Sequence, residues 1–188
     1  MTYILILSIL VFFLIHSISL NVTLRKSLIE KLGSNNRYKA VYSLIAGVSF
    51  TGMFLILRFY PGSENSELNN FVFDNIHKVL PLASILIIAA YIPNNHFKKY
   101  LRHPMLIGLT IWATTHLLIN TQYNQDIFFF AMIAFNIYMI IGIETRDKFN
   151  LKAGKCSWKN DLAVVALGLI GHVSLIKLHY FLSGVSLS

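Results

Sequence analysis

Residues 127–143 read IFFFAMIAFNIYMIIGI, an apolar run without a charged side chain. Five further runs are nearly as apolar, at residues 3–20, 41–60, 72–92, 105–122 and 162–182. At about 1.5 Å per helical residue, such runs approach or exceed the length needed to cross a hydrocarbon core about 30 Å thick. The sequence therefore predicts an all-α protein, a polytopic membrane helical bundle with about six transmembrane helices. The runs at 105–122 and 127–143 are the shortest, and their closeness predicts a tight antiparallel hairpin.

The composition agrees with this fold class. Of the 188 residues, 55% are hydrophobic and 13% are charged, whereas a soluble domain carries about 25% charged residues. At this length we expect a single integral membrane domain over residues 1–188. The net charge of +8 does not predict nucleic-acid binding, because the basic residues lie in short connections and form no soluble basic face.

The basic residues predict the orientation of the chain in the membrane. The first, third and fifth connections hold 13 of the 16 Lys and Arg residues. These residues are Arg25, Lys26, Lys31, Arg37, Lys39, Lys98, Lys99, Arg102, Arg146, Lys148, Lys152, Lys155 and Lys159. The second connection instead carries Glu64 and Glu67, and the fourth carries Asp126. By the positive-inside rule, both termini face the outer, periplasmic side. Residues 21–38 predict a short amphipathic helix at the inner interface, ended by Gly33.

Several of the apolar runs carry a histidine well inside them, where ionisable side chains are costly and usually functional. The leading candidates are His16 and His116. His116 shares a helical face with Gly108, Trp112 and Thr115. A small residue, an aromatic ring and an imidazole on one face are typical of a cofactor pocket in a helical bundle. The alternative is close helix packing through Gly108, with histidines that only hydrogen-bond a neighbouring helix.

The segment Arg102-His103-Pro104 precedes the run at 105–122. Proline suits the first turn of a helix, where its missing N–H is no loss. Arg102 and His103 would then lie at the inner interface beside a helix N-terminus, a place suited to anions. The simpler alternative is a positive-inside anchor followed by a proline that starts a helix.

Other parts of the sequence narrow the chemistry. Glu144 follows the run at 127–143, beside Arg146 and Asp147, and a local ion pair is the simplest interpretation there. The one cysteine, Cys156, allows no intramolecular disulfide. The sequence lacks a Cys-x-x-Cys-His motif, so any haem would be held without thioether links, and it lacks a His-Glu-x-x-His zinc motif.

Three segments resemble the NnrU family, and together they cover nearly the whole chain. They are His16-Ser17 with Arg25, Gly33, Arg37-Tyr38 and Tyr42-Ser43; Arg102-His103-Pro104-Met105-Leu106-Ile107-Gly108 with Trp112, His116-Leu117 and Asn120; and His179 to Gly184. The resemblance implies a bacterial inner-membrane protein associated with denitrification and nitric oxide metabolism.

The NnrU family is similar to the plant zeta-carotene isomerase, which uses a non-covalent b-type haem. The resemblance implies that His16 and His116 are the axial iron ligands. Trp112 and Gly108, on the same helical face as His116, would then shape the pocket. The cysteine associated with haem in that isomerase has no counterpart here, since Ala113 stands three residues before His116. This departure leaves isomerase activity open, while ligation by two histidines stays possible.

The depth of each histidine along its run leaves a rival pair. His16 lies about 7 Å from the inner end of its run, and His116 about 17 Å from the inner start of its own. His77 matches His116 better in depth. His77 is therefore the rival iron ligand.

A more distant resemblance is to isoprenylcysteine carboxyl methyltransferases. It rests on the Arg-His-Pro segment, Gly108 and Glu144, and it implies that Arg102, His103 and Glu144 lie near S-adenosylmethionine. Here Leu106 stands where those enzymes have an aromatic residue, and Thr145 stands where they have a second acid.

Three functions therefore follow from the sequence. The leading one is an NnrU-like inner-membrane protein that binds haem b and supports a redox or isomerisation step on a small or lipophilic substrate. The second is a membrane methyltransferase. The third is a non-enzymatic accessory protein of a membrane redox complex.

Overall fold

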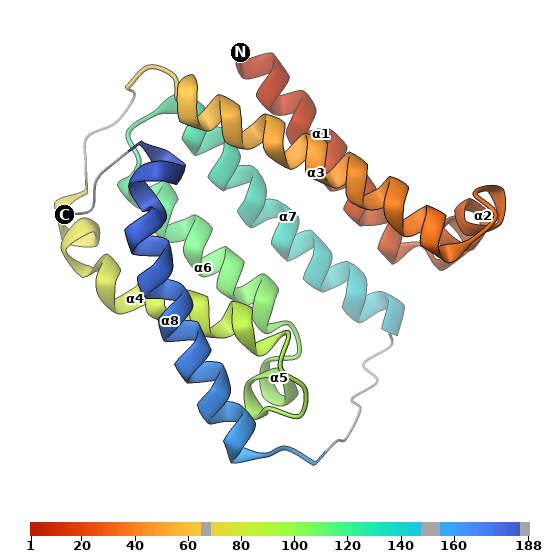
Figure 1. Ribbon diagram of the computed structural model, residues 1–188. Coiled ribbons are helices and arrows are strands. Elements are labelled where there is room, and N and C mark those ends of the chain that lie inside the picture. Colours follow the sequence, from red (N-terminus) through yellow and green to blue (C-terminus); the bar gives the residue numbers. More distant parts are fainter. Residues whose placement is uncertain (65–68, 148–154, 185–188) are drawn as a thin grey trace. The chain divides into compact units, whose positions relative to one another are not determined.

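The computed structural model describes residues 1–64, 69–147 and 155–184 (Figure 1). Within these ranges the regular secondary structure is helical, apart from an isolated bridge between Glu64 and Gln122. In the described part of the chain, five helices are long and apolar enough to cross a membrane, and a sixth apolar helix is shorter. The prediction of a helical membrane protein with about six apolar helices is confirmed. Glu67, Lys148 and Lys152, which contributed to the predicted orientation, lie outside the described residues.

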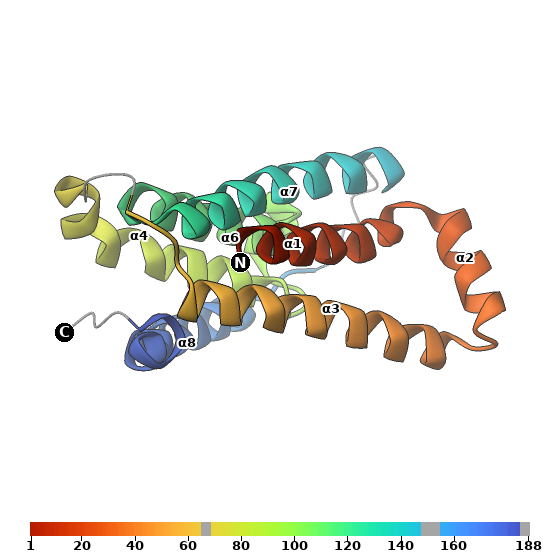
Figure 2. The ribbon, with the colours of Figure 1, turned by 90° about the horizontal axis from the view of Figure 1, so that it is seen from above.

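The chain divides into two compact units, Met1–Ser63 and Glu64–Ser188. The helices of the first unit are α1 (Thr2–Ser17), a 3-10 turn (Ile18–Leu20), α2 (Val22–Lys31) and α3 (Asn35–Phe59). α1 runs alongside α3, and α2 joins their ends (Figure 2). Leu5 and Met53 are almost fully buried. The two helices approach closely at Gly52, where a Cβ would lie 3.0 Å from the Ser8 hydroxyl oxygen.

The connection through α2 has clear start and stop residues. The Asn21 side chain accepts a hydrogen bond from the Leu24 N–H at 2.9 Å and so caps α2. Gly33 follows the helix with φ +78°, a backbone conformation that glycine adopts without steric cost. The Ser34 hydroxyl then caps α3. The predicted short helix and its end at Gly33 are both confirmed.

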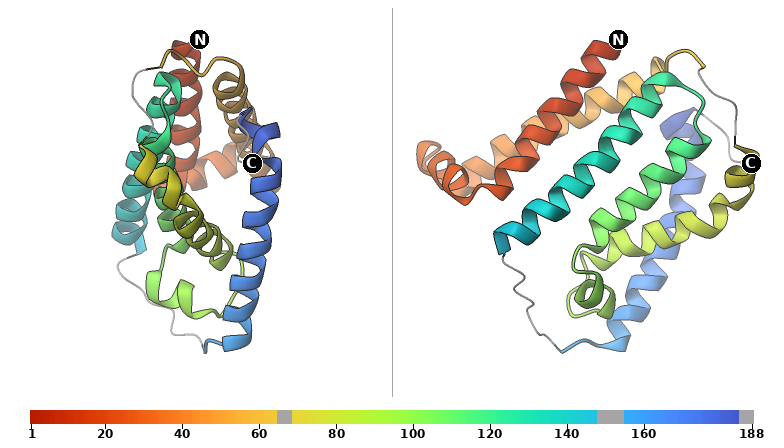
Figure 3. Two further views of the ribbon diagram at one scale, coloured as in Figure 1. Left: turned by 90° about the vertical axis from the view of Figure 1, so that its left-hand side faces the viewer. Right: turned by 180° about the vertical axis from the view of Figure 1, so that it is seen from behind.

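The second unit is a row of apolar helices (Figure 3). Its helices are α4 (Asn70–Ala89), α5 (His96–Leu101), α6 (Pro104–Ile119), α7 (Tyr123–Asp147) and α8 (Trp158–Ser183). α6 packs between α4 and α7, and α4 also packs against α8. Two glycines let these helices approach closely: Gly108 of α6 lies against Ala83, and Gly168 of α8 lies against Ile85. Small residues at such crossings let helix backbones approach in the absence of a hydrophobic driving force.

Two boundaries differ from the sequence prediction. α6 ends at Ile119, because Asn120 is extended with ψ 150°. α7 has 25 residues, extending beyond the predicted run at both ends. Of the two runs expected to be shortest, only the first is a short helix. The tight connection between α6 and α7 is confirmed.

Candidate functional site

The Arg-His-Pro segment lies where α5 ends and α6 begins. Arg102 follows α5 with φ +59° and ψ −47°, a region that residues with a side chain rarely adopt. Pro104 begins α6, as predicted. Strained backbone persists only where the surrounding structure holds it. The contacts of Arg102 and His103 therefore indicate what this turn positions.

Glu144, in the last turn of α7, contacts both side chains. Nη2 of Arg102 lies 2.8 Å from Oε2 of Glu144, and Nε2 of His103 lies 2.6 Å from Oε1. The three side chains are 15–24% exposed, so water screens these charges less than it screens a surface pair. Because a carboxylate only accepts hydrogen bonds, His103 donates through Nε2.

The local ion pair expected beside Glu144 forms between Arg146 and Asp147. Nε of Arg146 lies 2.6 Å from Oδ1 of Asp147, while Glu144 faces Arg102 and His103. The sequence signal for this arrangement was the distant methyltransferase pattern, which couples an Arg-His-Pro segment to a downstream acid. Local spacing could not reveal it, because 41 residues separate His103 from Glu144.

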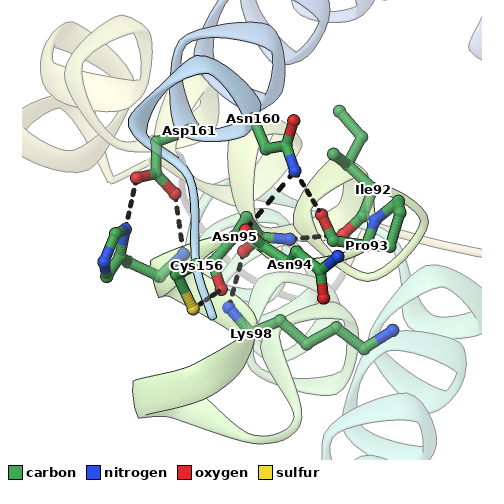
Figure 4. Close-up of polar contacts among 9 residues, drawn as sticks. Ile92, Pro93, Asn94, Asn95, Lys98, Cys156, Asn160 and Asp161 are labelled. Atoms are coloured by element: carbon green, nitrogen blue, oxygen red, sulfur yellow. Dashed lines mark hydrogen bonds and ion pairs between the residues drawn. The ribbon is translucent and has the colours of Figure 1, made fainter. Parts of the chain in front are cut away.

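The loop before this segment is fastened to the start of α8 (Figure 4). Asn95 is 1% exposed; its side chain donates to a carbonyl in the last turn of α4 at 2.8 Å and accepts the Lys98 N–H at 2.7 Å. Asp161, in the first turn of α8, accepts the backbone N–H of His96 at 2.7 Å and its ring Nδ1 at 2.6 Å. These bonds fix α5, the helix that leads directly into Arg102. Sequence reasoning missed the contact with α8, because Asp161 lies 65 residues after His96.

His116 lies on α6 among aromatic rings. Its ring centroid is 4.9 Å from that of Trp112 and 5.0 Å from that of Phe129 on α7. Its Nδ1 lies 2.9 Å from the Trp112 carbonyl oxygen. A carbonyl only accepts, so Nδ1 carries the proton and the lone pair is on Nε2. This is the tautomer that a histidine needs to bind a metal through Nε2.

His16 in α1 has the same local arrangement. Its Nδ1 lies 2.7 Å from the carbonyl oxygen of Phe12, four residues earlier. Its ring centroid is 4.0 Å from that of Phe12 and 5.3 Å from that of Tyr42 on α3. His16 and His116 thus have the same local arrangement. Each ring contacts the carbonyl oxygen and the aromatic ring of the residue one helical turn earlier, within its own unit.

The match to known proteins spans both units. The family described as NnrU protein matches residues 4–187. The chain belongs to the NnrU family. No curated protein and no solved structure matches it. Because the NnrU match covers nearly the whole chain, membership does not depend on the Arg-His-Pro segment alone.

In this NnrU-family protein, Gly108 lies against α4. A Cβ on Gly108 would lie 2.7 Å from the Ala83 carbonyl oxygen and 3.1 Å from the Leu86 Cβ. The structure therefore shows the close helix packing through Gly108 that the sequence offered as an alternative. The role of Gly108 in shaping a cofactor pocket stays a prediction. Trp112, one turn later, contacts α7 through Phe129, with ring centroids 5.2 Å apart.

The rival ligand His77 lies on α4, where it lines a cavity with His172 of α8. Within residues 1–64, 69–147 and 155–184, no group of three or more His, Cys, Asp or Glu could hold a metal ion. A haem iron with two axial imidazoles needs no such group. The choice between His16 and His77 as the partner of His116 therefore stays a prediction.

Proposed function

We propose that this NnrU-family membrane protein binds b-type haem, with His16 and His116 as the iron ligands. Its function would be to support a redox or isomerisation step on a small or lipophilic substrate, linked to nitric oxide metabolism. The observation that carries the proposal is the arrangement that these two histidines share. In each, Nδ1–H donates to the carbonyl four residues back and leaves the lone pair on Nε2.

This arrangement fits the donor chemistry of haem. Histidines that ligate metals almost always donate their other ring N–H to a carbonyl or carboxylate, which fixes the ring and raises its basicity. Imidazole is a common axial ligand of haem iron. A bound haem would supply a centre for electron transfer or a Lewis-acidic iron. Trp112 and Phe129 would exclude water from His116, while Phe12 and Tyr42 would hold the ring of His16.

The proposal is tested by the visible spectrum of the purified protein. The full chain, expressed with adequate haem supply and purified in mild detergent, should give a stoichiometric b-type signal in the pyridine haemochrome assay. His16→Ala and His116→Ala should each lose the low-spin spectrum, and added imidazole should restore it by entering the vacated space. His96→Ala, which removes a histidine at the start of α5 and outside the apolar runs, is the matched control and should keep the spectrum. A folded protein without haem, or two alanine variants with the original spectrum, would refute the ligand assignment.

A second function is favoured by a separate observation, the contact of Arg102 and His103 with Glu144. We propose as the alternative a membrane methyltransferase that holds S-adenosylmethionine beside this cluster. Thr145 offers no second carboxylate, and its hydroxyl donates back to the Ile141 carbonyl at 2.8 Å. Calorimetric titration with S-adenosylmethionine tests this alternative. Binding that Arg102→Ala abolishes would support a methyltransferase, and the absence of a binding heat at millimolar S-adenosylmethionine would rule it out. If neither haem nor methyl donor binds, a stable partner in mild-detergent purification would favour the accessory role.

A further inference from the structure

The cavity between α4 and α8 arises from the way these helices cross. At Gly168 the helices nearly touch, because a Cβ there would lie 2.6 Å from the Ile85 Cα. Beyond this crossing the two helices separate (Figures 1 and 3). About two turns away a cavity of about 320 Å³ opens between them. It is lined by Phe73, Asp74, Ile76, His77, Leu80, His172 and Ile176. Its volume lies at the lower end of the range of about 300–1,000 Å³ that is common for small-molecule pockets.

A proline alters the backbone of α4 beside this cavity. Pro81 lies inside α4, four residues after His77. Proline has no N–H to donate to the carbonyl at position i−4, and its ring pushes that carbonyl away. The main-chain oxygen of His77 therefore lacks its regular helical donor. At membrane depth such a carbonyl is tolerated where protein, water or a ligand satisfies it.

The two imidazoles of the cavity also lack partners. Among the described residues, neither His77 nor His172 makes a hydrogen bond or an ion pair. His77 lies about 9 Å into the apolar part of α4, counted from Phe71. His172 lies about 21 Å from the start of α8 at Trp158. Within the protein His77 is exposed and His172 is half-buried, so the cost of leaving them without a partner comes from the bilayer. Ionisable side chains at such depths usually mark a binding site or a pathway.

We propose that this cavity binds the head group of a lipophilic quinone. A quinone carbonyl accepts the N–H of an imidazole, and the hydroxyl of the reduced form donates to an imidazole nitrogen or to the His77 main-chain oxygen. Phe73 and Ile176 offer an apolar wall for the ring. Asp74 lies on the lining as well, and its negative charge disfavours the carboxylate of a fatty acid or the phosphate of a phospholipid. A neutral ring with two oxygens therefore fits the cavity better than an anionic lipid.

The cavity contains neither His16 nor His116, so quinone binding can be tested without haem. The full chain in phosphatidylcholine nanodiscs is irradiated with a short-tailed azidoquinone, and labelled peptides are located by mass spectrometry. Label is expected on segments 71–80 and 170–177, and decylubiquinone should displace it. Because each lost hydrogen bond weakens binding by about tenfold, His77→Leu and His172→Leu should each raise the Kd for decylubiquinone about tenfold.

Two further variants separate binding from folding. Leu80→Trp keeps both histidines but fills the cavity, so it should abolish specific labelling in a protein that still elutes as a single species. His179→Leu removes a histidine from the same helix outside the cavity lining and should leave the Kd unchanged. The proposal is overturned if label falls elsewhere, or if folded His77→Leu/His172→Leu protein keeps its affinity. Displacement by palmitate and not by decylubiquinone would likewise overturn it, by showing a fatty-acid site.

Discussion

Glu144→Gln should destabilise the protein by about 2–3 kcal/mol, although glutamine has nearly the same size and shape as glutamate. The variant keeps the shape of the side chain but leaves Arg102 and His103 without the carboxylate that they share. Removing one partner from a fully buried ion pair costs about 3–5 kcal/mol. The three side chains here are 15–24% exposed, so we discount that range for partial solvent screening.

The effect can be measured by SDS-induced unfolding in mixed micelles, followed by circular dichroism. The matched control is Asp147→Asn, which removes the carboxylate of the neighbouring pair with Arg146, whose side chains are 30% and 45% exposed. An exposed pair contributes about 0–1 kcal/mol, so the control should change little. If Glu144→Gln costs no more than Asp147→Asn, the cluster does not hold α6 to α7 and the reasoning fails. A double-mutant cycle with Arg102→Gln then gives the coupling energy directly.

Three further substitutions test the packing and the turns by the same unfolding measurement. Gly108→Ala should destabilise the protein by about 1–3 kcal/mol, because the new methyl group would lie 2.7 Å from a main-chain oxygen of α4. The control Gly47→Ala, where a Cβ meets nothing within 4 Å, should be neutral or slightly stabilising. Equal effects of the two substitutions would contradict the close contact at Gly108. Gly33→Ala should cost about 1 kcal/mol, because φ is +78° at that position, and an unchanged midpoint would show that the turn adapts. Asp161→Asn should lower the unfolding midpoint and speed the amide proton exchange of His96, because the carboxylate that accepts two hydrogen bonds from His96 is lost. Amide protection equal to that of the wild type would show that these bonds do not hold α5.

The helices could be predicted because a bilayer forces every spanning segment to satisfy its own backbone. Each of the six apolar runs therefore corresponds to an apolar helix among the described residues. Gly33 and Pro104 mark helix ends that local backbone geometry requires. The length of α7 was missed for a physical reason. Asn124 is polar and so fell outside the apolar run, yet it is only 3% exposed, because it lies within the packed end of the helix.

The candidate site was predictable only in its local parts. Each histidine finds its carbonyl partner four residues back on the same helix, so the arrangement of His16 and His116 follows from helical periodicity. The partner of His103 depends on how α6 and α7 pack, and the cavity beside His77 depends on where α4 and α8 cross. Contacts of this kind are set by tertiary packing, which no window of a single sequence contains.

The length of α6 makes bilayer thickness a variable for this protein. With 16 residues it spans about 24 Å, whereas a hydrocarbon core is about 30 Å thick. Its 25-residue neighbour α7 reaches about 37 Å. Hydrophobic mismatch costs fractions of a kcal/mol per Å, so the bilayer around α6 should become locally thinner to match its polar ends. Longer acyl chains would raise this strain, and membranes of shorter-chain lipids would relieve it.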